Sequence, residues 1–337
     1  YDVESQITSV TEKGLDPRNF ILCTDDCHSG TLVNEGHMNR VVRHAIDCGC
    51  DPLIAIQMAT INTACHFGLE RELGSITPGR RADFIVTSSI DDLPIEAVFA
   101  RGEKVAENGK LLTKCPHYPW PQSARETVNL GKKLKREDFV ISAPASLSSV
   151  NAKVIGIIEN QAPTKALELD LPVKHGKVIA KGDVCYLSIV ERHRGTGAVV
   201  NGFVSGFGYT GSMAIASSVA HDSHHIIVVG TNQDMMALAA NRLGEVGGGV
   251  SVWKDGAEVA LVELPIAGLM SDSKASEVSV KAQAIVSAMI DCGCTLNNAY
   301  MQHTLLALVV IPELRISDLG LVDVNRFELT EIIEQSS

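Results

Sequence analysis

The chain has 337 residues, of which 45% are hydrophobic and 4% aromatic, so it is long enough for two domains with mainly aliphatic cores. Its formal net charge of −11 disfavours nucleic acid and anionic membranes as partners, because phosphate binding needs clustered Lys and Arg. Nine cysteines, an odd number in a long chain without a recognisable secretory signal, predict a reducing, cytoplasmic location. No apolar run reaches the length of a membrane-spanning helix.

The first 73 residues have the pattern of an α/β region. Residues 20–24 form a short apolar run that stops at Asp25, which predicts a buried parallel strand followed by a carboxylate. A carboxylate at this end of a strand lies where α/β barrels place catalytic groups. One helix is predicted over 37–48, and a second over 52–66 begins after an Asp-Pro pair.

Short strands are predicted between residues 74 and 113, with Asn108-Gly109 as a hairpin turn. Residues 114–136 are rich in proline and basic side chains and predict a linker. From 137 to 337, an α+β unit with mostly antiparallel strands is expected. Its strands are predicted at 152–158, 184–190, 198–204, 213–219, 225–229, 250–253 and 257–263, and its helices at 232–243, 273–292 and 295–307.

Two Cys-x-Cys pairs, Cys48/Cys50 and Cys292/Cys294, could suggest a four-thiolate metal site. Their spacing differs from the Cys-x₂-Cys pattern common in zinc sites. Each pair falls where a helix is predicted to end on a glycine, so we interpret these residues as small buried side chains. The three glycines at 247–249 precede a predicted strand, which favours a turn or close backbone packing over phosphate binding.

Residues 59–86 carry the most specific motif. They contain, in order, Ala-Thr-x-Asn-x-Ala, Gly-x-Ile-x-Pro-Gly and Ala-Asp-x-x-Val. This succession resembles the closing segment of the metal-dependent amidohydrolase superfamily, in which the last barrel helix leads through a turn into a small β-sandwich. In physical terms, Asn62 can bond neighbouring backbone, and Asp83 can anchor the turn at Pro78-Gly79.

Further runs extend the resemblance, over essentially the whole chain, to bacterial adenine deaminases. The supporting runs are 23–26, 36–39, 218–224, 226–232, 247–249 and 264–271. The last four lie in a C-terminal domain that other amidohydrolases lack. The resemblance implies an α/β plus β fold: residues 1–73 as the end of a TIM-like (β/α)8 metal-hydrolase barrel, 74–113 as part of a small β-sandwich, 114–136 as a linker, and 137–337 as a C-terminal α+β domain.

The resemblance implies hydrolytic deamination of adenine to hypoxanthine and ammonia by a metal-bound hydroxide. It implies a binuclear centre of Mn or Fe, with Zn as another option, a small purine substrate, no nucleic acid or membrane partner, and a homo-oligomer, expected to be a dimer. Asp25 would ligate one metal and carry a proton, and Asp26 is the weaker candidate. The family's remaining His and Glu ligands are expected before residue 1, in a longer enzyme.

His221, Asp222, His224 and His225 form a second dense polar cluster. In one interpretation these residues reach the barrel mouth and help to bind the purine or position the metal. In the other they form a polar turn, in which Asp222 bonds backbone amides. His28, in the loop after the first predicted strand, could face either substrate or solvent.

Two other functions remain open at this point. Another amidohydrolase, such as a cyclic-amide hydrolase, is the alternative enzyme, although the C-terminal domain argues against it. A non-catalytic binding or assembly module is the alternative from a different class, because such a module would lack the other metal ligands. The substrate specificity and metal content of the full-length protein separate these alternatives.

Overall fold

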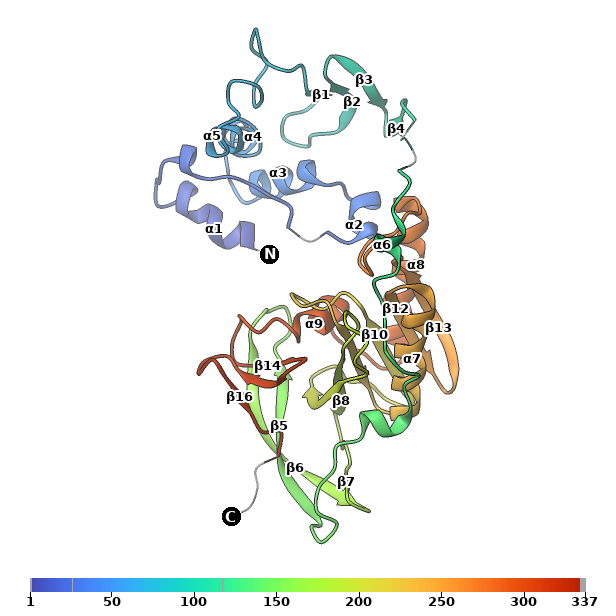
Figure 1. The fold of residues 1–337 in the computed structure, drawn as a ribbon. Helices are drawn as coiled ribbons and strands as arrows, with labels where there is room; N and C mark the ends of the chain where they lie inside the picture. The colour runs from blue at the N-terminus through green and yellow to red at the C-terminus, as the bar shows by residue number, and fades with distance from the viewer. Residues whose placement is uncertain (1, 26, 115, 117, 334–337) are drawn as a thin grey trace. The chain divides into compact units, whose positions relative to one another are not determined.

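The structure is a computed structural model that describes residues 2–25, 27–114, 116 and 118–333 (Figure 1). The chain forms two compact units, 1–118 and 119–337, here called unit 1 and unit 2. Both contain helices and strands, so the chain is a mixed α/β protein with several sheets. The boundary between the units falls inside the segment predicted as a linker. Within the described residues, no helix is long and apolar enough to cross a membrane.

Unit 1 begins with short helices around a small apolar core. These are α1 (Asp2–Thr11), the 3-10 helix η1 (Pro17–Asn19), α2 (Ser29–Asn34), α3 (Met38–Asp47), α4 (Pro52–Met58) and α5 (Ile61–His66). Asp51 caps α4, because its carboxylate accepts hydrogen bonds from the N–H groups of Leu53 and Ile54 at 2.9 and 3.2 Å. The predicted start of this helix is therefore confirmed. The core consists mainly of Ile7, Val42, Ala45, Cys50, Ala55, Met58 and Leu93.

The predicted helix over 52–66 is wrong in one respect, because it is interrupted at Thr60. Thr60 has φ −132° and ψ −91°, outside the helical region. Its hydroxyl donates to the carbonyl oxygen of Ile56 at 2.7 Å. A hydrogen bond of this kind from a β-branched residue tends to bend a helix. The chain therefore forms α4 and α5 as separate helices.

The prediction of a strand over 20–24 is also wrong. This segment runs extended but pairs with no strand among the described residues. Leu22 N–H donates instead to the carbonyl oxygen of Met58, at the end of α4, at 3.2 Å. A strand requires a ladder of hydrogen bonds to a neighbour, whereas an apolar run determines only local conformation.

Unit 1 ends in a four-stranded antiparallel meander. Its strands are β1 (Phe84–Thr87), β2 (Ile95–Ala100), β3 (Glu103–Glu107) and β4 (Lys110–Leu111). Phe84 pairs with Phe99, and their rings stack with centroids 4.5 Å apart. Asn108 and Gly109 both have positive φ, at 48° and 74°, which confirms the predicted hairpin turn. The β-sandwich and the barrel both stay predictions.

Unit 2 is built on a nine-stranded sheet (Figure 1). The strands are β5 (Ser149–Ile157), β6 (Thr164–Lys174), β7 (Lys177–Val178), β8 (Val184–Val190), β9 (Val199–Ser205), β10 (Met213–Ser217), β11 (Ile226–Gly230), β12 (Gly249–Lys254) and β13 (Ala257–Glu263). Their order is β13-β12-β10-β11-β8-β9-β5-β6-β7. The β5–β9 pair is parallel and the others are antiparallel, as predicted for most of this unit.

Both faces of this sheet are covered. Along β8, Leu187 and Ile189 belong to one apolar core, while Tyr186 and Val190 belong to the other. Helix α8 (Ala275–Asp291), the start of α9 (Ala299–Leu305) and the residues directly after α9 contribute to the first core, and α7 (Gln233–Val246) contributes to the second. Burial on both faces explains why β8, β10 and β11 read as continuous apolar runs.

The remaining elements of unit 2 are short. They are α6 (Gln122–Arg125), the 3-10 helix η2 (Arg136–Phe139), and a three-stranded sheet of β14 (Leu314–Ser317), β15 (Gly320–Asp323) and β16 (Glu328–Thr330). Leu130, Leu134 and Phe139 are buried against the core that α7 lines. The second half of the segment predicted as a linker therefore packs as part of unit 2.

Candidate functional site

In unit 1, an amide side chain helps to hold the segment that leads to Asp25. Asn62 Nδ2 donates to the carbonyl oxygens of Pro17 and Phe20, at 2.9 and 3.0 Å. The prediction that Asn62 bonds nearby backbone is confirmed. The two acceptors precede Asp25 by eight and five residues, so this clamp holds the start of the segment that leads to that carboxylate.

Asp25 itself is exposed and adopts a left-handed backbone conformation, with φ 51°. Asp is among the few non-glycine residues that tolerate this region, and such conformations gather at functional sites. His28 is half-buried at the position that precedes α2. Asp26, the weaker candidate of the sequence, lies outside the described residues.

The predicted metal centre requires several ligand side chains that lie close together. The described residues contain no group of three or more His, Cys, Asp or Glu side chains that could hold a metal ion. Asp25 would therefore supply only part of a ligand set. Burial raises the pKa of Cys50, Cys292 and Cys294, which disfavours the thiolate form that metals bind. The packing interpretation of the Cys-x-Cys pairs is thus supported.

Asp83 was expected to anchor the turn at Pro78-Gly79, and the structure corrects this. Its carboxylate accepts a hydrogen bond from the N–H of Arg101 at 2.6 Å. Arg101 has φ 53° and lies in the tight turn between β2 and β3. Asp83 therefore fixes the β2–β3 hairpin, which lies close to it in space but distant from it in the sequence. The local motif did not reveal this contact.

In unit 2, the loop that joins β10 to β11 contains the predicted histidine cluster. His221 N–H donates to the carbonyl oxygen of Thr304 at 3.2 Å, and the rings of His221 and His224 meet edge to face with centroids 5.4 Å apart. His225 is buried, and its Nε2 lies 3.5 Å from an oxygen of Asp318. Asp222 is exposed. Burial lowers the pKa of both His224 and His225, so both are neutral at pH 7.

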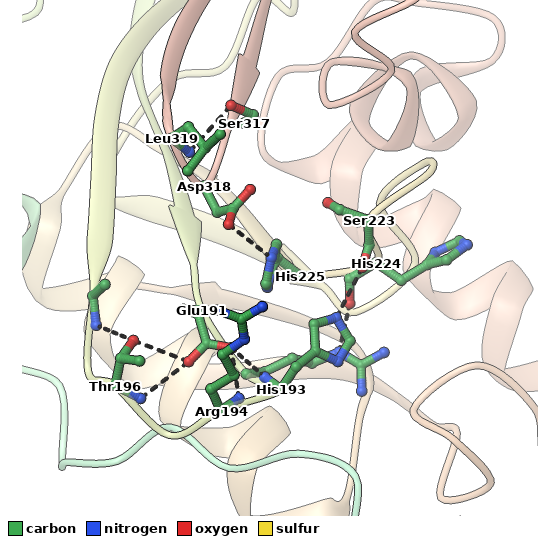
Figure 2. Close-up of polar contacts among 12 residues, drawn as sticks. Glu191, His193, Arg194, Thr196, Ser223, His224, His225, Ser317, Asp318 and Leu319 are labelled. Carbon is green, nitrogen blue, oxygen red and sulfur yellow. Dashed lines mark hydrogen bonds and ion pairs between the residues drawn. The ribbon is translucent and has the colours of Figure 1, made fainter.

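A second loop, which sequence reasoning missed, lies beside this cluster (Figure 2). It follows β8 and begins at Glu191, whose carboxylate accepts hydrogen bonds from the N–H groups of His193, Arg194 and Thr196 at 2.5, 2.7 and 3.0 Å. The Thr196 hydroxyl adds a fourth at 3.0 Å. Burial opposes ionisation of Glu191, but these hydrogen bonds prevail and lower its pKa to about 2.

The two loops are joined directly. His193 Nε2 lies 2.8 Å from the carbonyl oxygen of Ser223, and the rings of His193 and His225 have centroids 4.7 Å apart (Figure 2). Arg192, only 1% exposed, donates through Nε to the carbonyl oxygen of His224 at 2.5 Å. The rule applied to Asp25, a polar group directly after a buried strand, would also have found this loop.

Three runs singled out in the sequence meet beside Arg192. Its guanidinium also donates to the carbonyl oxygen of Ala267 at 3.1 Å. Ser218 Oγ donates to the carbonyl oxygen of Gly268 at 2.6 Å and accepts from the N–H of Gly249 at 2.7 Å. A Cβ on Gly249 would lie 1.9 Å from the carbonyl oxygen of Val262. The glycine run at 247–249 therefore serves close backbone packing, as interpreted.

Both units of the chain are similar in sequence to known proteins. Residues 4–107 match the sequence model of the amidohydrolase family, and residues 161–328 match that of the adenine deaminase C-terminal domain. The class of protein is thus that of the amidohydrolases. This chain is similar to adenine deaminases from Ruegeria sp. (strain TM1040), Roseobacter denitrificans and Moorella thermoacetica. The sequence identities are 72%, 71% and 42%, and each alignment covers 99% of this chain.

The chain belongs to the adenine deaminase family. It spans 56% of the length of the three relatives named above, so these relatives contain a large part that has no counterpart here.

Proposed function

We propose that this chain is part of an enzyme that hydrolyses adenine to hypoxanthine and ammonia. The observation that carries the proposal is the 72% identity, over 99% of the chain, to a protein named adenine deaminase. The two matched family models lie in different units, which supports an assignment that involves the whole chain. We also assign residues 1–73 to the end of a barrel, 74–113 to part of a β-sandwich and 137–337 to the C-terminal domain.

Asp25 is the residue of this chain that we assign to the chemistry. The clamp of Asn62 on the preceding segment and the left-handed conformation of Asp25 support a carboxylate held in one orientation. In hydrolytic deamination a water oxygen adds to C6 of adenine and one proton of the water goes to N1. The bond from C6 to the amino nitrogen then breaks as that nitrogen takes the second proton and leaves as ammonia, and C6 becomes a carbonyl. The Asp25 carboxylate can accept a proton from the water and return it to the leaving nitrogen.

The cofactor belongs to the same proposal. Because the chain spans 56% of the length of a similar adenine deaminase, we assign the further metal ligands to the part of such an enzyme that this chain does not span. A divalent metal, when bound, lowers the pKa of water and so supplies a nucleophile at neutral pH. We propose a binuclear Mn or Fe centre, with Zn as the alternative, and Asp25 as one ligand.

The remaining assignments are supported more locally. We propose that His221, Asp222 and His224 contact the purine, because the loop that carries them is positioned by a buried guanidinium and a shared hydrogen-bond network. His28 and Asp26 are the secondary candidates near Asp25. We further propose a homodimer in the cytoplasm, where the free thiols recorded in the described chain would stay reduced.

Replacement of Asp25 tests the chemical assignment. In the full-length protein, Asp25→Asn keeps the size of the side chain but removes the proton acceptor, so we expect kcat/KM for adenine to fall by about 10²-fold or more. Asp91→Asn, at another exposed carboxylate of unit 1, is the matched control and should leave kcat/KM unchanged. The bound-metal content should also fall in Asp25→Asn. Wild-type kinetics and metal content in this variant would refute the role of Asp25.

A further inference from the structure

We propose that residues 218–225, the loop that joins β10 to β11, form an acid-sensitive latch. The latch is closed, as in the structure, while His224 and His225 are neutral, and it opens when these side chains take up protons. All of its contacts lie within unit 2. The proposal goes beyond the proposed function and does not depend on it, because neither the contacts nor the test involves a substrate.

Backbone contacts to two other segments hold the loop closed. His221 N–H donates to the carbonyl oxygen of Thr304, in α9, at 3.2 Å. Arg192 Nε, in the loop after β8, donates to the carbonyl oxygen of His224 at 2.5 Å. Both bonds end on backbone groups of the loop, so neither needs a particular charge on its side chains. The sensitivity to acid must therefore come from the imidazole rings.

A turn within the loop requires that Nδ1 of His224 carry no proton. Ala220 N–H donates to Nδ1 of His224 at 3.3 Å, and His224 N–H donates to the carbonyl oxygen of Ala220 at 2.7 Å. A backbone N–H can only donate, so Nδ1 must offer its lone pair. An imidazolium carries hydrogen on both ring nitrogens and would set two N–H groups against each other. Protonation of His224 therefore breaks this turn.

His225 has the same requirement for a different reason. It is only 7% exposed, and its Nδ1 is buried without a hydrogen-bond partner in the described part of the chain. Its Nε2 lies 3.5 Å from a carboxylate oxygen of Asp318, in the turn between β14 and β15 (Figure 2). A neutral ring can direct Nε2–H toward this carboxylate. The imidazolium would in addition bury an N–H at Nδ1 that has no acceptor, which is unfavourable.

The groups that face His224 agree with a neutral ring in the closed loop. Burial is the main cause that lowers the pKa of His224, and His221, Arg192 and His193 act in the same direction. The carboxylate of Asp222 opposes them, but the pKa of His224 stays below its ordinary value of 6.5. The closed loop therefore binds a proton at His224 less readily than an open, solvated loop does.

The groups that face His225 are more evenly divided. Burial is again the main cause that lowers the pKa, whereas the carboxylates of Asp318 and Glu191 raise it and His193 and Arg192 lower it. The net effect lowers the pKa of His225 below its ordinary value of 6.5. Because both histidines bind protons more weakly in the closed loop, closure is most favourable above about pH 6.5 and weakens as the pH falls below it.

The backbone at His224 favours opening once the turn is broken. His224 has φ 52°, a left-handed conformation that is unfavourable for a residue with a side chain. In the closed loop, the two bonds to Ala220 and the bond from Arg192 offset this strain. Protonation removes the bond to Nδ1, so less of the strain is offset and the loop can relax.

Proton linkage determines the size of the effect. A histidine with a pKa of about 6.5 in the open loop that stays neutral in the closed loop raises the opening constant by about tenfold between pH 7.5 and pH 5.5. Two such histidines would raise it by about a hundredfold. Any protonation of the closed loop reduces these values. We therefore expect the opening constant to rise by about tenfold or more.

Amide hydrogen exchange of the full-length protein measures opening without any activity. Peptides that cover 218–225 report on the loop, and peptides from β11 report on the sheet, after correction for the intrinsic effect of pH on exchange. Between pH 7.5 and pH 5.5, we expect about tenfold or more additional opening of the loop and much less of β11. An unchanged loop, or an equal increase in β11, would overturn the proposal, since the second result means general unfolding.

Two substitutions remove the titrating groups and keep the contacts. His224→Asn places an amide oxygen near the position of Nδ1, and Asn tolerates the left-handed backbone. His225→Gln keeps an N–H donor near the position of Nε2. Each variant should stay closed at pH 7.5 and show a smaller response to acid than the wild type. The double variant should show no response, and a wild-type response in it would refute the latch.

His175→Asn is the matched control. His175 also has φ 52°, but it is exposed in the turn between β6 and β7. The same substitution there should leave the response of residues 218–225 to acid at its wild-type size. Loss of the response in His175→Asn would show that it does not come from the two buried histidines and would also overturn the proposal.

Discussion

Glu191 makes the stability of unit 2 depend on pH in a way that can be calculated. Glu191 is 7% exposed, and this burial raises its pKa, but hydrogen bonds from Thr196, Arg194 and His193 outweigh burial and lower the folded-state pKa to about 2, against an ordinary 4.5. Each pKa unit corresponds to about 1.4 kcal/mol, so the ionised group contributes about 3 kcal/mol at neutral pH. Because the folded pKa is depressed, this contribution is complete above about pH 5 and is lost as the pH falls toward 2.

The test compares wild type with Glu191→Gln, which keeps the side-chain size but has no charge to lose. Urea unfolding followed by tryptophan fluorescence reports on unit 2, because Trp120 and Trp253 both lie there. Between pH 6 and pH 3, we expect the unfolding free energy of the wild type to fall by about 2 kcal/mol more than that of the variant. If the unfolding free energies of wild type and Glu191→Gln changed equally with pH, the N–H groups around Glu191 would not stabilise its ionised form.

Two further substitutions test the local structure. Asn62→Ala leaves the carbonyl oxygens of Pro17 and Phe20 without their donor, so we expect about 1–2 kcal/mol of destabilisation by urea unfolding and a lower kcat/KM in the full-length protein. Wild-type values would mean that the clamp is dispensable. Gly249→Ala places a methyl group against the carbonyl oxygen of Val262 at φ 140°, and thermal unfolding should show a large fall in Tm. An unchanged Tm would contradict the close packing.

Sequence reasoning succeeded where the signal is local. The Asp-Pro pair at 51–52 predicted the start of a helix, and the Asp51 side chain accepts hydrogen bonds from the first turn of α4. The Asn108-Gly109 hairpin was found for the same reason, since Asn and Gly are the residues that best tolerate the positive φ that both positions adopt. Local patterns do not show whether a segment finds a neighbouring strand to pair with. The apolar run at 20–24 was therefore mistaken for a strand.

Strand β6 shows a signal that was present but overlooked. Leu167, Leu169 and Leu171 alternate with two carboxylates, Glu168 and Asp170, which is the period of a half-buried strand. For the candidate site, the histidine loop was found from its composition. Its support by Arg192 was not, because the three carbonyl partners come from distant segments and a backbone acceptor has no side-chain signature.

The most direct test is to measure turnover of three compounds by the full-length protein under the same conditions, as ammonia release from adenine and adenosine and as ring opening of dihydroorotate. We expect turnover of adenine to hypoxanthine, with little or no turnover of the other two compounds. Hydrolysis of dihydroorotate, or release of ammonia from adenosine but not from adenine, would refute the assignment as an adenine deaminase.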